Sequence, residues 1–250
     1  MEIARLTRYG LLSVCGEDAR EFLHAQLTND IANLPAGRAA LAGWCSAKGR
    51  LLASFLVVPL RDGFLLQLAR DLAPAVAKRL AMFVLRAKVK IADASEQWLQ
   101  YGAWGELLDL AVPPENFAVA GSEKRIAVRV ESARILVLTA EKLDRETAAE
   151  SRWARDEIRA GRPLITGATQ DMFVPQMVNF DSLGAVNFQK GCYPGQEIVA
   201  RAQYRGQVKR RMQRLSAPQG ASLQPGQEFN GGVVVDSAGG ELLAVLPVQE

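Results

Sequence analysis

Apolar and polar residues in the first part of the chain alternate between short strand patterns and helix patterns. Residues 10–16 are mostly apolar and end in a glycine, which predicts a short strand. Asp18 can cap a helix that runs to Leu27, because Phe22, Leu23 and Leu27 give that stretch one apolar face. The polar residues that follow, at positions 28–30, favour a turn and end the helix.

The same reasoning predicts an α+β arrangement for the first two thirds of the chain. Turn signals around Gly49 and at Asp62-Gly63 separate apolar runs into hairpins. Helix patterns cover residues 71–86, with Pro74 in the first turn, and residues 143–161, with Gly161 as a stop signal. Strands are expected at residues 39–47, 51–60, 64–69, 88–92, 98–104, 126–130 and 135–139.

The pattern of apolar, proline and glycine residues changes in the last third of the chain. Residues 162–194 have weak secondary-structure patterns, as in binding loops. Short strand patterns separated by proline and glycine turns then predict a small all-β module of the barrel type. Its strands are expected at residues 207–215, 228–229, 232–235 and 242–248. The expected domains are two α+β domains, residues 1–95 and 96–205, and a β module, residues 206–250.

Composition limits the classes of partner. The chain has 250 residues, and its 30 basic and 27 acidic side chains give a net charge of +3. This balance argues against direct nucleic-acid binding as the main function. No apolar run reaches the length of a membrane span, and the first twenty residues lack the apolar core of a secretory signal. We therefore expect no membrane partner.

The cysteines and the single histidine argue against a built-in metal site. Cys15, Cys45 and Cys192 are odd in number and far apart, and no metal-binding spacing is present. We expect no metal and no disulfide framework, which fits the reducing cytoplasm. Cys15 and Cys45 are interpreted as structural. His24 lies on the first predicted helix, where a lone histidine is more often a surface or half-buried residue than a catalyst.

The loop that begins at Lys190 has a composition that a hydrophobic core does not require. Two glycines and a proline within five residues force a sharp turn, and Cys192 lies inside it. The charge of Lys190 and the N-terminus of a helix opening near Gln196 would both favour the thiolate. Two interpretations remain open from these residues: a reactive thiol, or a tight turn whose cysteine is a small buried apolar residue.

A second unusual segment, residues 171–181, precedes this loop. It combines the amides of Gln176 and Asn179 with apolar and aromatic side chains, which suits a planar heterocycle with a hydrogen-bonding edge. The alternative is a loop that buries its apolar residues and ties its backbone with amides. Arg201 can supply charge for an anionic tail of such a ligand. The motifs for a serine triad, a nucleophile elbow and a phosphate-binding loop are absent.

The run from Lys190 to Arg201, KGCYPGQEIVAR, resembles the signature K-G-C-[FY]-x-G-Q-E-x-x-x-[RK] of the YgfZ family. These are folate-binding proteins of iron–sulfur cluster maintenance, related in fold to the aminomethyltransferase (T-protein) of the glycine cleavage system. Residues 22–30 and 48–50 resemble the family pattern F-L-x-x-Q-L-T-N-D … K-G-R. Residues 174–176 and Asn179 resemble the stretch before the signature, so the resemblance extends from about residue 10 to about residue 210.

The resemblance implies three small domains around a central channel that holds tetrahydrofolate or a derivative, with a C-terminal β-barrel. It implies that Gln176 and Asn179 hold the pterin, and that Lys190 helps to keep Cys192 as the thiolate. The remaining candidates shape the loop or line the channel, and they are Trp44, Tyr193, Gln196, Glu197 and Arg201.

The sequence also departs from the T-protein pattern. T-proteins carry an aspartate pair after the first hairpin, where this chain has Ala53 and Ser54. Without those carboxylates, proton transfer at the folate nitrogen loses its assistance, which argues against glycine cleavage and leaves any enzymatic activity open. Gln176 stands where T-proteins carry a glutamate, so it can still donate and accept hydrogen bonds but has no charge.

The expected function is that of a cytoplasmic, tetrahydrofolate-binding accessory protein that assembles or repairs iron–sulfur clusters in client enzymes. The clients would include tRNA-modifying enzymes such as the tRNA methylthiotransferase. Cys192 would act by transiently bonding a cluster, a persulfide or a client thiol. The alternative is a folate-dependent one-carbon transferase or demethylase on the same scaffold.

Overall fold

The computed structural model describes residues 1–107, 110–122, 124–143, 146–204, 206 and 208–248. The chain forms two compact units, each assembled from separate segments. The first unit comprises Met1–Leu23, Ile31–Ala40 and Leu56–Glu150, and the second comprises His24–Asp30, Leu41–Phe55 and Ser151–Glu250. The predicted domain boundaries at residues 95 and 205 stay a prediction, and residue 205 lies outside the described residues.

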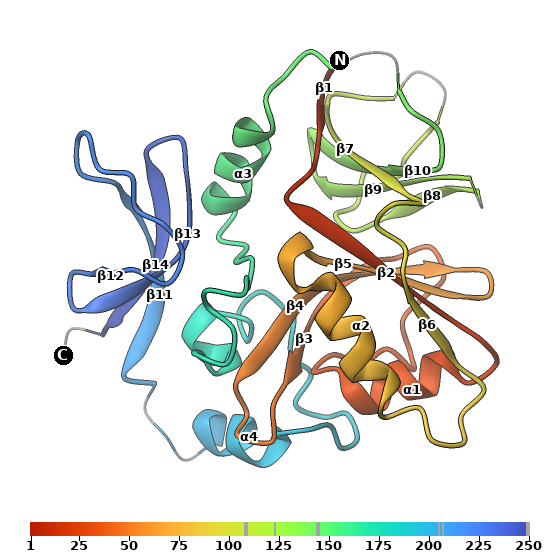
Figure 1. Cartoon of the computed structure of the whole chain (residues 1–250), viewed down its shortest axis with the longest axis horizontal. Coiled ribbons are helices and arrows are strands. Elements are labelled where there is room, and N and C mark those ends of the chain that lie inside the picture. The colour runs from red at the N-terminus through yellow and green to blue at the C-terminus, as the bar shows by residue number, and fades with distance from the viewer. Residues whose placement is uncertain (108–109, 123, 144–145, 205, 207, 249–250) are drawn as a thin grey trace. The chain divides into compact units, whose positions relative to one another are not determined.

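An antiparallel five-stranded sheet forms one half of the first unit (Figure 1). Its core contains Tyr101, Ile135 and Val137, which are almost fully buried because alternate residues of these strands face the same side. In sheet order, the strands are Glu2–Arg5 (β1), Leu99–Trp104 (β7), Arg134–Thr139 (β10), Arg125–Glu131 (β9) and Val119–Ser122 (β8).

Strand β1 was not predicted from the sequence. Its four residues are too few for an alternation of apolar and polar positions to be recognised. Residues Glu2 to Arg5 pair antiparallel with β7, and this pairing buries Ile3. The strand therefore depends on a partner almost a hundred residues later in the chain.

The second five-stranded sheet contains the hairpins that the turn signals predicted. Strand β4 is buried along nearly its whole length, which explains its uninterrupted apolar sequence. Gly63 has a φ of 152°, and the Asp62-Gly63 turn joins β4 to β5 as predicted. In sheet order, the strands are Ala40–Cys45 (β3), Leu51–Leu60 (β4), Gly63–Ala69 (β5), Tyr9–Cys15 (β2) and Lys90–Asp93 (β6).

Two predicted helices are shorter than expected. A 3-10 turn, Arg70–Leu72 (η1), leads into Ala73–Ala81 (α2), which contacts β2 and β6 and ends five residues early (Figure 1). Beyond Ala81 the apolar side chains Met82, Phe83 and Leu85 are exposed, so burial no longer stabilises a helix there. Helix Glu150–Arg159 (α3) replaces the prediction for 143–161, and no helix of the described residues is long and apolar enough to cross a membrane.

The second unit carries the C-terminal sheet, coloured blue in Figure 1. Leu242, Ala244 and Leu246 form its small core. Among the described residues this sheet is open, with β11 and β12 as its edges, so the expected C-terminal β-barrel is not confirmed. In sheet order, the strands are Arg210–Ser216 (β11), Glu241–Pro247 (β14), Gly232–Ala238 (β13) and Glu228–Phe229 (β12).

Three short elements of the second unit surround the predicted site. They are the end of helix Ala19–Gln26 (α1), the 3-10 helix Pro175–Val178 (η2) and helix Gln196–Tyr204 (α4). The end of α1 and the predicted helix at Gln196 are therefore confirmed. Residues 162–194 otherwise form turns and loops, as their sequence indicated.

Thr28 fixes the turn that follows α1. Its hydroxyl donates to the carbonyl of Ala185 at 2.6 Å and accepts from the amide of Gly43 at 2.7 Å. The threonine is fully buried, so no water replaces either bond if the hydroxyl is removed. One side chain thus ties the turn to a strand and to the loop that leads toward Cys192.

Replacing Thr28 with valine keeps the shape of the side chain but leaves a buried amide and a buried carbonyl without this partner. We expect Thr28→Val to lower the free energy of unfolding by about 2–4 kcal/mol, measured by urea denaturation. Thr7→Val is the matched control, because the hydroxyl of Thr7 bonds Glu150 at an exposed position and should cost about 1 kcal/mol or less. Equal losses in the two variants would contradict the role given to Thr28.

Candidate functional site

The structure places the thiol of Cys192 at the surface of the second unit. Cys192 and Gly191 are exposed, whereas the next residue, Tyr193, is buried. The interpretation of Cys192 as a small buried apolar residue therefore does not hold. The loop presents the sulfur to solvent while its neighbouring tyrosine anchors the backbone.

Lys190 anchors the loop on the end of α1. Its ammonium group donates to the carbonyls of His24 at 2.6 Å, Leu27 at 3.0 Å and Gly191 at 3.3 Å. It also lies 4.8 Å from the centre of the Tyr193 ring, a cation–π contact. Only 8% of Lys190 is exposed. The first two carbonyls lie at the negative end of the helix dipole, where a cation is stabilised.

This geometry defines how Lys190 can act on the thiol. An ammonium group has three N–H donors, and all three are directed at backbone carbonyls. Lys190 therefore has no donor left for a hydrogen bond to the Cys192 sulfur and acts on it only through space. Burial lowers the pKa of Lys190 to about 8, while the charges of Asp30 and Cys192 act in the opposite direction.

Gly195 lets the loop pack against the hairpin that joins β3 and β4. Its φ of 78° is left-handed, and a Cβ at this position would lie 2.4 Å from the carbonyl oxygen of Ser46. Gly49, also left-handed, is the second close neighbour, 2.6 Å from that position. Two glycines from distant parts of the chain thus meet backbone to backbone, and α4 begins directly after this contact.

The charged candidates of α4 face solvent. Glu197 and Arg201 lie one helical turn apart and form an ion pair of 3.1 Å, with both side chains largely exposed. Such a pair contributes little to stability but neutralises the charge that Arg201 would offer to an anionic ligand. Gln196 opens the same helix and is half-buried.

Gln176, in contrast, is fully buried and linked to α4. Its Nε2 donates to the carbonyl of Val199 at 2.7 Å, and it is 0% exposed. The carbonyl fixes the amide orientation, because the opposite orientation would place two oxygens against each other. Oε1 of Gln176 is then a buried acceptor, and no donor among the described residues bonds it.

Asn179 and its neighbours tie this segment to the C-terminal sheet. Nδ2 of Asn179 donates to the carbonyl of Met212 at 2.9 Å, and its backbone is left-handed with a φ of 60°. Two bonds of 2.7 Å join Arg211 to Asp181, and this contact raises the pKa of Arg211. The amide of Asn179 thus has a structural partner in addition to its predicted role.

Trp44 and the residues at the place of the T-protein aspartate pair lie on β3 and β4, the two strands joined by the hairpin at residues 46–50. Trp44 is buried in β3, and burial raises the pKa of its neighbour Cys45 to about 12, with Asp171 adding to the effect. Ala53 is fully buried, and the hydroxyl of Ser54 accepts from the amide of Ile165 at 3.0 Å. The place of the T-protein aspartate pair is therefore filled by residues that pack and bond internally.

One neighbour of the loop was missed by the sequence reasoning. His24 contacts Asp30, with 3.2 Å between Nδ1 and Oδ1, and its Nε2 lies 3.7 Å from where a Cβ on Gly191 would be. No spacing in the sequence indicates this arrangement, because 167 positions separate His24 from Gly191. The lysine contact with the end of α1 and the bond between Thr28 and Ala185 bring the two segments together.

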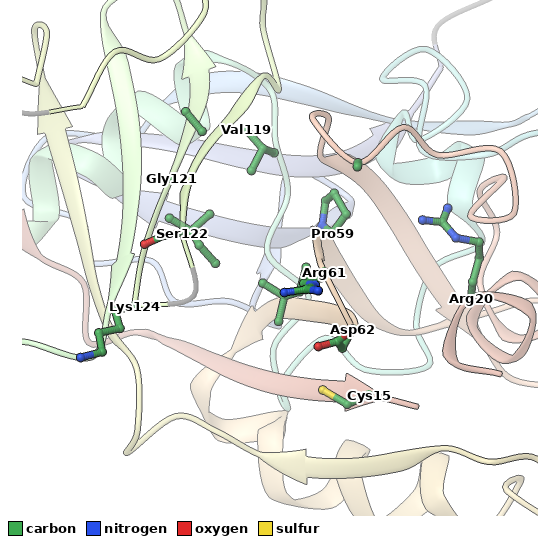
Figure 2. Close-up of a pocket in the computed structure, with 13 residues that line it drawn as sticks. Cys15, Arg20, Pro59, Arg61, Asp62, Val119, Gly121, Ser122 and Lys124 are labelled. Atoms are coloured by element: carbon green, nitrogen blue, oxygen red, sulfur yellow. The ribbon is translucent and has the colours of Figure 1, made fainter. Parts of the chain in front are cut away.

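A cavity of about 1070 Å³ lies in the first unit and contains none of the predicted site residues. Figure 2 shows Arg20, Arg61 and Lys124 on different sides of it rather than gathered at one point. The guanidinium of Arg20 already bonds the carbonyls of Ile31 and Leu34 at 2.8 Å. The candidate chemistry therefore stays with the Cys192 loop of the second unit.

Comparison with known proteins gives relatives over most of the chain, although no family model matches it. An uncharacterized protein of Haemophilus influenzae is 34% identical over 83% of this chain and 70% of its own length. The tRNA-modifying protein YgfZ of Edwardsiella ictaluri is 33% identical over 84% of this chain and 69% of its own length. The protein of the same name in Vibrio vulnificus is 31% identical over 86% of this chain and 70% of its own length.

A solved structure has the same fold. Aminomethyltransferase T of the glycine cleavage system from Bartonella henselae superposes with a TM-score of 0.72, over 98% of this chain and 78% of its own. The two sequences are 16% identical. The mixed α and β fold of the T-protein is thus confirmed for this chain.

The contact between Gly195 and Gly49 can be tested by adding a single methyl group. We expect Gly195→Ala to lower the free energy of unfolding by about 2–4 kcal/mol, because it combines a left-handed strain of about 1–2 kcal/mol with a backbone clash. Gly184→Ala is the matched control, since Gly184 is also left-handed but has no atom within 4 Å of the added Cβ. Urea denaturation measures both, and equal effects would rule out close packing at Gly195.

The buried ammonium of Lys190 predicts a pH dependence of stability. Its pKa is about 8 in the folded chain and 10.5 ordinarily, so between these values the unfolded chain binds more protons. The free energy of unfolding of the wild type should therefore rise, relative to Lys190→Met, as pH increases from 8 to 10.5. The slope should reach at most about 1.4 kcal/mol per pH unit. A flat or falling difference in urea denaturation across this range would contradict the expectation.

Proposed function

The chain belongs to the YgfZ family, and on that premise we propose that it binds tetrahydrofolate or a derivative and helps to assemble or repair iron–sulfur clusters in client enzymes. Cys192 is the residue through which it acts. The observation that carries the folate part of the proposal is the buried Oε1 of Gln176, and the observation that carries the thiol part is the exposure of Cys192.

Gln176 suits the edge of a pterin. Because its Nε2 is committed to Val199, its Oε1 can only accept a hydrogen bond, and a pterin edge carries N–H donors. A buried acceptor without a partner is costly, and a ligand donor would remove that cost. When bound, tetrahydrofolate supplies a reduced pterin that can carry a one-carbon unit.

The other candidate residues have supporting roles in this proposal. Asn179 holds the segment of Gln176 in place through β11 and offers a second amide to the ligand. Tyr193 and Gln196 shape the loop, and Trp44 lines the ligand channel. Glu197 would have to release Arg201 before that guanidinium could bind an anionic folate tail. The channel between three domains stays a prediction from the family resemblance.

The proposed clients include tRNA-modifying enzymes. The named relatives are called tRNA-modifying proteins, and the near balance of 30 basic and 27 acidic residues favours action through a client enzyme rather than direct tRNA binding. We place this activity in the cytoplasm. The buried Ala53 and Ser54 offer no carboxylate for one-carbon transfer, so the accessory role is favoured over a transferase or demethylase.

Titration with tetrahydrofolate tests the ligand. A bound ligand must stabilise the folded chain, by about 2.7 kcal/mol at a hundredfold excess over Kd, so the thermal midpoint should rise with ligand concentration. Gln176→Met should weaken binding by about tenfold or more, since it removes a buried hydrogen bond of roughly 1.4 kcal/mol or more. Gln203→Met, at an exposed glutamine of α4, is the control and should bind normally.

The role of the Cys192 thiol is tested by comparing the wild type with Cys192→Ser. Cys192→Ser should bind tetrahydrofolate as the wild type does but should fail to restore iron–sulfur enzyme activity in cells that lack the protein. Normal enzyme activity with Cys192→Ser would remove the thiol from the mechanism. Absence of any ligand-induced change in the thermal midpoint of the wild type would overturn the folate part of the proposal.

A further inference from the structure

Gln176 lies in a 3-10 helix that is too short to hold a side chain in place by itself. This helix, η2, has only the four residues Pro175–Val178. Short 3-10 segments have poor hydrogen-bond geometry and little stability of their own. A buried acceptor can select a ligand donor only if its position is fixed, because hydrogen bonds depend steeply on distance and angle. The contacts that fix η2 from outside are therefore part of the candidate site.

Arg211 joins η2 to the C-terminal sheet. Its Nη1 donates to the backbone carbonyl of Gln176 at 3.0 Å and to Oδ1 of Asp181 at 2.7 Å, and its Nη2 donates to Oδ2 of Asp181 at 2.7 Å. The side chains of Arg211 and Asp181 are 32% and 12% exposed, so both are largely shielded from water. One guanidinium thus bonds the residue that carries the acceptor and a carboxylate five positions later.

A second bond from the same strand supports this attachment. Nδ2 of Asn179 donates to the backbone carbonyl of Met212 at 2.9 Å, and Met212 follows Arg211 in β11. All seven residues of β11 pair antiparallel with β14. The short helix is therefore attached to a regular strand of a sheet, which positions a side chain more precisely than a loop does.

Gln176 is held at two points, and its Oε1 lies beyond both of them. Arg211 bonds its backbone carbonyl, and its Nε2 donates to the carbonyl of Val199 in α4 at 2.7 Å. The residue is 0% exposed, and Oε1 has no donor among the described residues. A shift of the backbone at Gln176 would therefore move the acceptor that is assigned to the ligand.

We propose that Arg211 is a positioning residue of the ligand site. With Asp181 as its counter-ion, it fixes the backbone of Gln176 so that Oε1 stays at one place as an acceptor. In this role Arg211 acts through Gln176 and does not touch the ligand, and the C-terminal sheet becomes part of the framework of the site. The inference rests on the proposed function in assigning Oε1 to the ligand, and it adds the residues that hold this atom.

Hydrogen exchange in the ligand-free, ¹⁵N-labelled full chain tests the positioning directly. The side-chain amide of Gln176 gives a nuclear magnetic resonance signal that is identified by its absence in Gln176→Met. We expect Arg211→Met to speed the exchange of this amide by about tenfold or more, because a hydrogen bond from a charged group to the backbone of Gln176 is lost. The backbone amide of Leu243, buried in β14, should keep its rate.

Two further variants refine this test. Arg211→Lys keeps the charge but lacks the planar fork that bonds both carboxylate oxygens and the carbonyl, so it should give an intermediate rate. Arg214→Met is the matched control on the same strand. The side chain of Arg214 is exposed and bonds only the carbonyl of Arg159, at 3.3 Å, among the printed contacts of β11 with its surroundings, so the exchange at Gln176 should stay unchanged.

A double-mutant cycle with tetrahydrofolate shows whether Arg211 acts through Gln176. Arg211→Met should weaken binding by about tenfold in the wild-type background and by less than about twofold in the Gln176→Met background, because the acceptor that it positions is then absent. Arg214→Met should bind as the wild type does. Affinities are obtained from the rise of the thermal midpoint with ligand concentration.

Unchanged exchange of the Gln176 amide in Arg211→Met would overturn the proposal. It would also be overturned if Leu243 exchanged faster by the same factor, since Arg211 would then stabilise the whole sheet, or if the loss of affinity were equal in both backgrounds. If Arg211→Met fails to fold, Asp181→Asn carries both tests, because it keeps the shape of the side chain and removes the counter-charge. Faster exchange at Gln176 alone, in a chain that does not bind tetrahydrofolate, would support this inference and overturn the folate proposal.

Discussion

The buried ammonium of Lys190 joins the thiol loop to the end of a helix that lies 166 residues earlier in the chain. A charge with so little exposure is stable only if its hydrogens are satisfied, and three backbone carbonyls satisfy them. The contact fixes the loop, brings Gly191 to the ring of His24 and leaves Cys192 exposed.

A second set of contacts keeps the other end of the loop in place. Gly195 meets Gly49 at backbone distance, and α4 starts there with its carbonyl at Val199 bound by Gln176. The loop is thus held at Lys190 by charge and at Gly195 by close packing. Between these two points, Cys192 is exposed to solvent.

Local features of this fold could be predicted from the sequence because they depend on neighbouring residues. The Asp62-Gly63 turn, the end of α1 before Thr28 and the start of α4 after Gly195 all follow from turn and capping chemistry. The loop itself was identified by its glycines, its proline and its cysteine.

Features that depend on distant partners could not be predicted in this way. Strand β1 exists because β7 pairs with it, and α2 ends early because Met82 and its apolar neighbours have no surface to cover. The contacts of the candidate site also depend on residues that are distant in the sequence. Lys190 looked like a partner of the thiol from its spacing, but its hydrogens are used by α1, and His24 was placed beside the loop only by the fold.

The long separation between the parts of this site has a consequence for the order of folding during synthesis. Thr28 bonds Ala185 across 157 positions, and Lys190 bonds His24 across 166. Closing such loops is entropically costly and slow, and neither contact can form before residue 185 has left the ribosome. The end of α1 therefore cannot make these two contacts until the later loop has been synthesised. The thiol loop therefore gains its attachment to the end of α1 only after Lys190 has been synthesised.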